Sequence, residues 1–288
     1  MPLYFFLSGL FFKTYGNYSG FLKRKINKLL IPFLFFRFAS CLISSFFGPA
    51  VLGGRRMFDF LVGQMQAPNT PIWFLICLFW LNQMFYGVYK ISSRFKNFVA
   101  VLSGLSLAVG ILGFYLGTTN YDIKVMNIGS AMTAMPFFCC GYLFNRHTDI
   151  LYPNRWDKYL LWAAMVCAVY TILFARSVDY FSNSYESSLW ITYSCGLTGV
   201  LCVLFLSKMI GRLPLISYFG RYSIMILVTH MPILQRLHPY FMDLPWPLWS
   251  RIALCITVAL LSYILLIPIM KKWLPHVTAQ KDLIPVTP

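Results

Sequence analysis

Residues 1–37 read MPLYFFLSGLFFKTYGNYSGFLKRKINKLLIPFLFFR, and they join two apolar runs through a basic segment. The first run, from Pro2 to Phe12, would form only about 16 Å of helix at roughly 1.5 Å per residue, about half the hydrocarbon thickness of a bilayer. The second run opens at Leu29 and is long enough to begin a membrane-spanning helix. The basic segment between them carries Lys13, Lys23, Arg24, Lys25 and Lys28. This alternation predicts a membrane protein whose basic segment lies at the cytoplasmic surface.

The composition of the whole chain agrees with this interpretation. Of its 288 residues, 59% are hydrophobic and 11% are charged, whereas soluble domains carry about 25% charged residues. The mean hydropathy is +0.67. The net charge of +16 is distributed among short connectors rather than on one polar face, so we expect no nucleic-acid partner. The sequence predicts an all-α, polytopic integral membrane bundle in a lipid bilayer, with one transmembrane domain over residues 1–275 and a tail over 276–288.

Membrane-spanning helices need about 20 mainly apolar residues, and this criterion locates eight spans in the chain. We expect them near residues 29–47, 72–89, 98–117, 127–145, 158–175, 188–207, 222–235 and 248–270. The span that begins at residue 222 is expected to extend a few residues further. Together with the short opening run, these segments predict about nine transmembrane helices.

The distribution of Lys and Arg predicts the orientation, because cytoplasmic connectors are enriched in these residues. Seventeen of the 24 Lys and Arg fall in one set of alternate connectors, which begins with residues 13–28 and ends with the tail. Five fall in the other set. The C-terminus is therefore expected in the cytoplasm, with Met1 outside. One more helix ahead of Met1 would give ten spans with both ends inside.

Acidic residues and cysteines give no sign of a metal or carboxylate site. All eight Asp and Glu lie in connectors, at span ends or in the tail. Their placement argues against a proton relay through the membrane and against the buried carboxylate pair of glycosidases. All eight Cys lie within apolar runs without metal-ligand spacing, so we expect them to be packing residues. We therefore predict no bound metal.

Apart from Lys158 and Arg251 near span ends, two basic side chains lie inside predicted spans, where an ionisable group is costly and usually faces the bundle interior. His230 is either satisfied by a neighbouring helix or serves as a base or hydrogen-bonding group in a polar cavity. A neutral imidazole, with a reference pKa of about 6.5, suits proton removal from a hydroxyl. Arg37 either extends to the interface or joins the cations of residues 24–28 in binding an anion such as phosphate. The basic cluster by itself is also explained by topology or by attraction to anionic lipid.

Four stretches, in this order, carry a resemblance that extends over nearly the whole chain: PLYFFLSGLFF, FLKRKINKLLIPFLFF, APNTPIWFLICLFWLNQMFY and LISYFGRYSIMILVTHMPIL. Together they resemble acyltransferase family 3, a family of multi-pass membrane O-acyltransferases. The resemblance implies ten membrane helices and transfer of an acyl group, usually acetyl from cytoplasmic acetyl-CoA. The acceptor it implies is a hydroxyl of a cell-surface glycan or of its lipid-linked precursor. Acyl-CoA would be a co-substrate, with no cofactor bound.

The resemblance also implies roles for individual residues. The matching positions are Ser8 and Gly9 in a serine-glycine element, Arg24, Lys25, Lys28 and Pro32 in a basic segment, Trp73, Phe74 and Leu75 in a WFL element, and Gly220, Ser223 and His230 in a late helix. The basic segment is where the phosphates of the donor are expected, with Arg37 as a further candidate. Ser8, Trp73 and Ser223 are expected near the substrate.

The family's histidine most often regarded as catalytic follows an arginine on its first helix, which has no counterpart in this sequence. We expect either a start further upstream, with Met1 internal to a longer protein, or a genuine fragment. In both cases His230 is expected to be an accessory or positioning group rather than the principal base.

The expected function is therefore O-acyl transfer by a multi-pass protein of the cell membrane, with the bacterial inner membrane as the expected location. The alternative is a non-enzymatic membrane protein, such as a glycan transporter or an inactive fragment. Translocation that does not depend on CoA would distinguish a transporter from an enzyme. The sequence predicts no particular oligomeric state.

Overall fold

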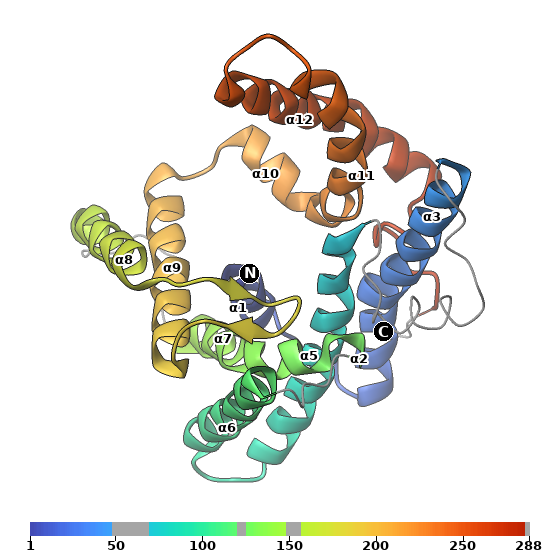
Figure 1. Ribbon diagram of the computed structural model, residues 1–288. Helices are drawn as coiled ribbons and strands as arrows, with labels where there is room; N and C mark the ends of the chain where they lie inside the picture. The colour runs from blue at the N-terminus through green and yellow to red at the C-terminus, as the bar shows by residue number, and fades with distance from the viewer. Residues whose placement is uncertain (48–68, 120–124, 148–156, 286–288) are drawn as a thin grey trace. The chain divides into compact units, whose positions relative to one another are not determined.

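The computed structural model describes residues 1–47, 69–119, 125–147 and 157–285, which form helices and a two-stranded hairpin (Figure 1). The chain divides into two compact units. One comprises Met1–Tyr18 and Cys77–Leu213, and the other comprises Ser19–Ile76 and Pro214–Pro288. Helix α5 (Trp73–Ser92) contributes residues to both units.

The first unit is a bundle in which helices pack mainly in pairs. Besides the greater part of α5, its elements are α1 (Pro2–Leu10), α6 (Phe98–Thr118), α7 (Ile128–His147), α8 (Leu160–Phe174), β1 (Val178–Asp179), β2 (Ser184–Tyr185) and α9 (Leu189–Ile210). Helix α7 packs against α1 and α6, and α9 packs against α8 and α1. Phe6 and Leu10 of α1 form a buried cluster with Val200 of α9.

Two glycines allow α1 and α7 to touch through their backbones. A Cβ atom on Gly9 would lie 1.9 Å from the carbonyl oxygen of Phe138, and one on Gly141 would lie 1.9 Å from that of Phe6. Real Cβ atoms essentially never approach so closely, so a side chain at either position would push the helices apart. Small residues commonly permit close helix packing in membranes. The glycine of the serine-glycine element therefore has a packing role.

The β1–β2 hairpin forms within a segment that the sequence predicts only as an outer connector. Val178 pairs with Tyr185 in its antiparallel register. Asn183 is fully buried with a positive φ of 52°, and its Nδ2 donates to the carbonyl oxygen of Gly113 at 3.1 Å. Its Oδ1 accepts hydrogen bonds from the hydroxyls of Thr133 at 3.0 Å and Tyr185 at 2.7 Å. The hairpin is thus fastened to α6 and α7 by one side-chain amide.

The second unit holds the basic segment from Ser19 onward and the last three helices. Its elements are α2 (Tyr18–Lys25), a π-helical turn (Ile26–Leu30), α3 (Ile31–Phe47), a 3₁₀ turn (Thr70–Ile72), α10 (Pro214–Arg221), α11 (Ser223–Met242) and α12 (Leu248–Trp273). Helix α11 packs along α12 and also contacts α3 and the 3₁₀ turn. The hydroxyls of Thr229 and Tyr263 are hydrogen-bonded at 3.1 Å and join α11 to α12.

The positions of the predicted spans agree with the helices. Each of the eight predicted segments coincides with a helix, and the one predicted from residue 222 extends to Met242. In the described ranges, five segments are long and apolar enough to cross a membrane: Thr70–Ser92, Phe98–Thr118, Asp157–Phe174, Leu189–Ile210 and Leu248–Trp273. The chain is an all-α, multi-pass membrane protein, but the predicted number of nine spans is not confirmed.

Three of the predicted segments do not meet this criterion within the described ranges. Helix α3 has 17 residues up to Phe47, where the described range ends, and α7 ends in the polar sequence Asn145-Arg146-His147. Helix α11 contains Pro232 and Pro239, together with polar residues in its second half. The basic connector also differs from the prediction, because residues 18–30 continue into α3 as helix instead of forming a loop.

Candidate functional site

The structure places all but one of the predicted site residues in the second unit. Arg24 and Lys25 lie on α2, Lys28 on the π-helical turn, Arg37 on α3, Trp73 at the start of α5, and Ser223 and His230 on α11. Ser8 lies on α1 in the first unit, where it is half-buried. One compact unit therefore carries both the predicted donor residues and His230.

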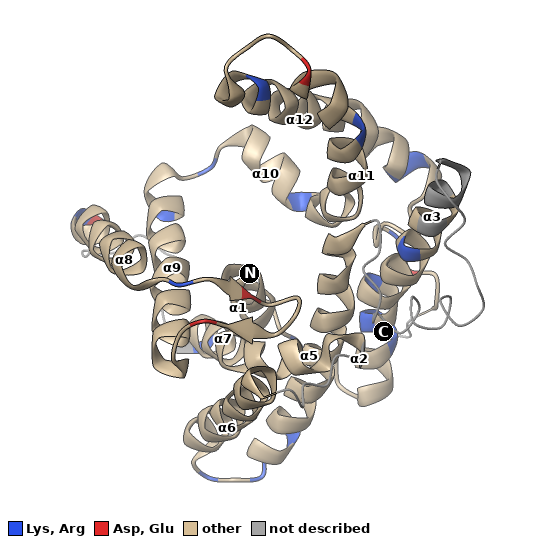
Figure 2. Cartoon of the chain, viewed as in Figure 1, with Lys and Arg blue, Asp and Glu red and all other residues tan. Residues whose placement is uncertain are grey.

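The basic segment is an amphipathic helix that leads directly into α3. Phe21 is fully buried, while the last turn of α2 carries Lys23, Arg24 and Lys25. Figure 2 shows Lys and Arg recurring along α2 and α3. The helix therefore presents several positive charges within two turns, an arrangement suited to a group with more than one phosphate.

Lys25 lies in a less polar environment than an ordinary surface lysine. Its side chain is half-buried, and its Nζ lies 5.4 Å from the centroid of the Phe21 ring. Burial disfavours the charged form and lowers the pKa of Lys25 from its ordinary value to about 8. Lys25 therefore loses its charge within a pH range in which Arg24 keeps its own.

The lowered pKa of Lys25 predicts a pH-dependent donor affinity. Below about pH 8 the ammonium is charged and attracts an anion; above it the amine is neutral and this contribution is lost. An exposed or half-exposed ion pair contributes about 0.2–1 kcal/mol, so we expect the Kd for acetyl-CoA to rise by a factor of about 1.4 to 5 between pH 7 and pH 9. Titration calorimetry on the purified protein measures this change. In Lys25→Arg the side chain stays charged, so the rise in Kd between pH 7 and pH 9 should disappear. An equal rise in that variant would contradict the origin of the pH dependence in Lys25.

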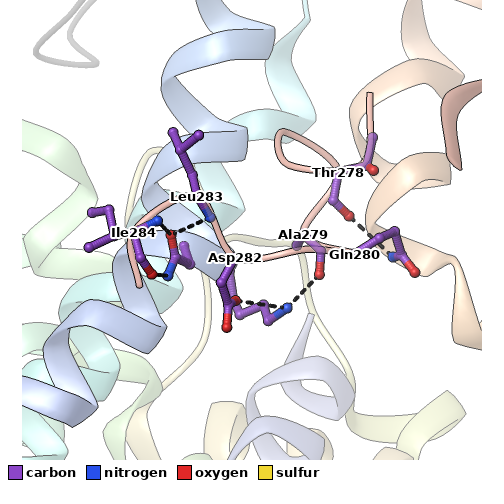
Figure 3. A network of polar contacts seen from close by, with 8 residues as sticks. Thr278, Ala279, Gln280, Asp282, Leu283 and Ile284 are labelled. Carbon is purple, nitrogen blue, oxygen red and sulfur yellow. Dashed lines mark hydrogen bonds and ion pairs between the residues drawn. The ribbon is translucent and has the colours of Figure 1, made fainter. Parts of the chain in front are cut away.

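Lys28 already has partners within the chain. Its Nζ donates to the carbonyl oxygen of Ala279 at 2.7 Å and forms an ion pair with Asp282 at 3.3 Å. The adjacent Asn27 is fully buried and hydrogen-bonded to the backbone of Leu283 and Ile284. Figure 3 shows the tail side of this network. The basic segment is thus joined to the C-terminal segment at the position of its last cation.

Arg37 is buried inside the second unit instead of extending to a surface. Its side chain is 3% exposed, and its guanidinium carbon lies 5.5 Å from the centroid of the Phe33 ring, one turn earlier on α3. A guanidinium remains charged in a protein interior, so a buried arginine within an apolar helix commonly marks a functional site. The arrangement is compatible with anion binding.

The ring of His230 has a defined orientation. Its Nδ1 lies 3.0 Å from the carbonyl oxygen of Ile226, one turn earlier on α11. A carbonyl oxygen can only accept, so Nδ1 carries the hydrogen, and Nε2 of the neutral ring bears a lone pair. His230 can therefore accept a proton or a hydrogen bond at Nε2 while Nδ1 remains attached to its own helix.

Asn69 is a residue of this unit that the sequence analysis does not single out. Its Nδ2 donates to the carbonyl oxygen of Val228 at 2.6 Å, and its side chain is 1% exposed. In a regular helix the carbonyl of Val228 would accept from the N–H of residue 232, but that residue is proline and has none. The amide of Asn69 therefore supplies the hydrogen bond that Pro232 cannot, at the carbonyl of Val228, two residues before His230. Pro232 is the sequence signal for an unpaired carbonyl, although it does not identify the partner.

Asn69 and Pro232 should therefore be coupled energetically. Asn69→Ala leaves a buried carbonyl without a donor, which costs about 1–3 kcal/mol. Pro232→Ala returns an N–H to residue 232, so Asn69→Ala should cost less in that background. Denaturant unfolding of the four proteins in detergent measures the coupling.

Asn82 provides a matched control. It is equally buried, and its Nδ2 donates to the carbonyl oxygen of Leu78 on its own helix at 2.7 Å. The effects of Asn82→Ala and Pro232→Ala on the free energy of unfolding should therefore be additive. If Asn69→Ala lowers the free energy of unfolding equally with and without Pro232→Ala, then Asn69 does not replace the N–H that Pro232 lacks.

The remaining predicted residues have less defined surroundings. Trp73 is buried and meets Phe74 edge to face with ring centroids 6.3 Å apart, while Ser223 is the exposed first residue of α11. Across the described ranges, no group of three or more His, Cys, Asp or Glu is arranged to hold a metal ion. Trp73 is positioned by packing, and Ser223 is accessible to a ligand.

Comparison with known proteins adds one result. Residues 1–267 match a family model described as "Acyltransferase domain". No match was found among curated proteins or among solved structures. The matched range contains every predicted site residue, and it ends before the segment that contacts Asn27 and Lys28.

Proposed function

The chain belongs to acyltransferase family 3, and from this premise we propose that it transfers an acyl group from cytoplasmic acyl-CoA to a hydroxyl acceptor. The acyl group is expected to be acetyl, and the acceptor a cell-surface glycan or its lipid-linked precursor. Family membership supports the reaction class, and the composition of the spans supports its location in a membrane. In this proposal the C-terminus is cytoplasmic and the membrane is the inner membrane of a bacterium.

The observation that carries the proposal is the presence of the basic segment and His230 in the same compact unit. The π-helical turn leads from the cations of α2 into α3, and α3 contacts the helix that carries His230. Arg24, Lys25 and Lys28 would hold the phosphates of the donor. A donor bound there would place its thioester on the same unit as the imidazole.

The proposed reaction needs a group that receives the proton of the acceptor. The hydroxyl oxygen attacks the thioester carbonyl carbon, a C–O bond forms, the C–S bond breaks, and the CoA thiolate receives the proton that the hydroxyl loses. His230 would accept a hydrogen bond from the hydroxyl at Nε2, which orients the oxygen and favours its attack. This role makes His230 an accessory group in acyl transfer.

The test is a transfer assay with the protein reconstituted in liposomes. Acetyl-CoA labelled in its acetyl carbonyl is supplied with lipid-linked glycan extracted from the source membrane. The proposal expects label in the glycan as an alkali-labile ester, with one CoA thiol released per ester formed. Movement of the glycan across the bilayer without CoA consumption would instead support the transporter alternative and overturn the proposal.

A further inference from the structure

The C-terminal segment after α12 folds back on itself before it reaches the basic segment. The backbone N–H groups of Gln280 and Lys281 both donate to the carbonyl oxygen of Pro275, at 2.9 and 3.0 Å. The hydroxyl of Thr278 donates to the carbonyl oxygen of Leu274 at 2.8 Å, and Thr278 is fully buried. Ala279 follows with a left-handed backbone, φ 61°, a conformation uncommon for residues other than glycine. The segment is therefore an ordered turn that directs residues 279–284 along a defined path (Figure 3).

Asn27 binds the backbone of this segment at three points. Its Nδ2 donates to the carbonyl oxygen of Ile284 at 2.8 Å, and its Oδ1 accepts from the N–H groups of Ile284 at 2.9 Å and Leu283 at 3.1 Å. Asn27 is fully buried, so losing these partners would leave a polar side chain unsatisfied. The amide of Asn27 therefore anchors the segment to the π-helical turn.

Lys28 and Asp282 form a second, weaker contact in the same place. The carboxylate lies 3.3 Å from Nζ, and the two side chains are 44% and 36% exposed. Exposed pairs of this kind exchange readily with competing ions and are screened by salt. Arg24 lies one helical turn before Lys28, so Asp282 introduces a negative charge beside the cations that the proposed function assigns to the donor.

We propose that residues 279–284 act as an internal competitor at the donor site: Asn27 anchors the segment, and Asp282 occupies Lys28 in place of a phosphate of the acyl donor. The inference rests on the proposed function for the donor assignment, whereas the anchoring itself does not. The segment lies outside the family match, which ends at residue 267. Donor affinity would then be regulated by an element of this chain in addition to the family's shared residues.

Competition is tested by measuring the Kd of CoA for the purified protein at fixed ionic strength. Asp282→Asn removes the charge and leaves the Asn27 contacts in place, so the Kd should fall by a factor of about 1.4 to 5, the range of an exposed ion pair. The same substitution in a Lys28→Gln background should have no effect. Asp243→Asn, which removes an exposed carboxylate at the end of α11, is the matched control and should leave the Kd unchanged. An unchanged Kd in Asp282→Asn would overturn the competition.

Anchoring is tested separately by trypsin cleavage after the exposed Lys281, followed by intact mass. Asn27→Ala should accelerate cleavage at least several-fold, and CoA should accelerate it in the natural sequence by displacing the segment. Equal cleavage rates with and without Asn27 would overturn the anchoring. If the natural sequence binds no CoA, the proposed donor site and the competition both fail, while faster cleavage of Asn27→Ala would still establish the anchored segment.

Discussion

His230→Ala is expected to lower kcat/KM for acyl transfer about 10- to 100-fold, because a hydrogen bond to a group that gains charge contributes about 1.5–3 kcal/mol and about 1.4 kcal/mol is tenfold. The substitution removes the Nε2 lone pair that would accept the hydrogen bond from the acceptor hydroxyl, together with the Nδ1 contact to Ile226. Binding of acetyl-CoA should change little, because the expected contact is with the acceptor. The measurement is steady-state transfer of labelled acetyl groups by reconstituted protein, with the amount of folded protein determined by gel filtration.

Two further variants distinguish the roles of His230. His238, an exposed histidine on the same helix, is the matched control, and His238→Ala should retain full activity. His230→Gln keeps an acceptor and a donor but cannot take up a proton. Recovery of most of the activity in His230→Gln would indicate a positioning role through hydrogen bonding alone. Undiminished transfer by His230→Ala would show that the imidazole serves helix packing only.

A triple variant without the three cations of the basic segment is expected to raise KM for acetyl-CoA about 10- to 100-fold with little change in kcat. In this variant Arg24, Lys25 and Lys28 are each replaced by Gln. Three cations that each contribute up to about 1 kcal/mol to phosphate binding give a total of this size, at about 1.4 kcal/mol per tenfold change. A rise in KM at constant kcat is the result expected when binding is lost equally from the ground state and the transition state. The measurement is initial rate against acetyl-CoA concentration at a saturating acceptor concentration.

A variant with the same charge change separates donor binding from topology. Lys90, Arg94 and Lys96 are three exposed cations of another predicted cytoplasmic connector. Replacing all three by Gln removes the same charge, and it should leave KM unchanged. If this control raises KM equally, the effect belongs to the overall positive charge and not to the basic segment. A reversed orientation of either variant, found by cysteine labelling, would leave only a topological role for its cations.

The spans could be predicted because each needs about 20 apolar residues, a length that few other structures require. The fold of the basic segment could not, since its charges indicated only a connector. Phe21 gives α2 an apolar face, and the π-helical turn then joins it to α3 without a break. The β1–β2 hairpin was missed for a similar reason: its anchoring by Asn183 depends on groups of α6 and α7 that lie 50 or more residues earlier.

In the candidate site, too, the sequence indicated which residues matter but not which groups they contact. His230 was recognisable because an ionisable side chain inside an apolar run is costly. Two contacts of the site depend on tertiary packing instead: the bond from Asn69 to Val228 across 159 positions and the bond from Asn27 to Ile284 across 257 positions. Two ion pairs join connectors that the charge pattern assigns to the same side of the membrane: Lys208 with Asp157 at 2.5 Å, and Lys28 with Asp282 at 3.3 Å.

The backbone contact between α1 and α7 sets a requirement on the order of assembly during synthesis. Roughly 120 residues separate the end of α1 from the start of α7, and ribosomes add about 5–20 residues per second. The surface that receives Gly9 therefore exists only about 10 s after α1 has been made. We expect α1 to complete its packing only after α7 has been made, so that a segment synthesised early is packed late.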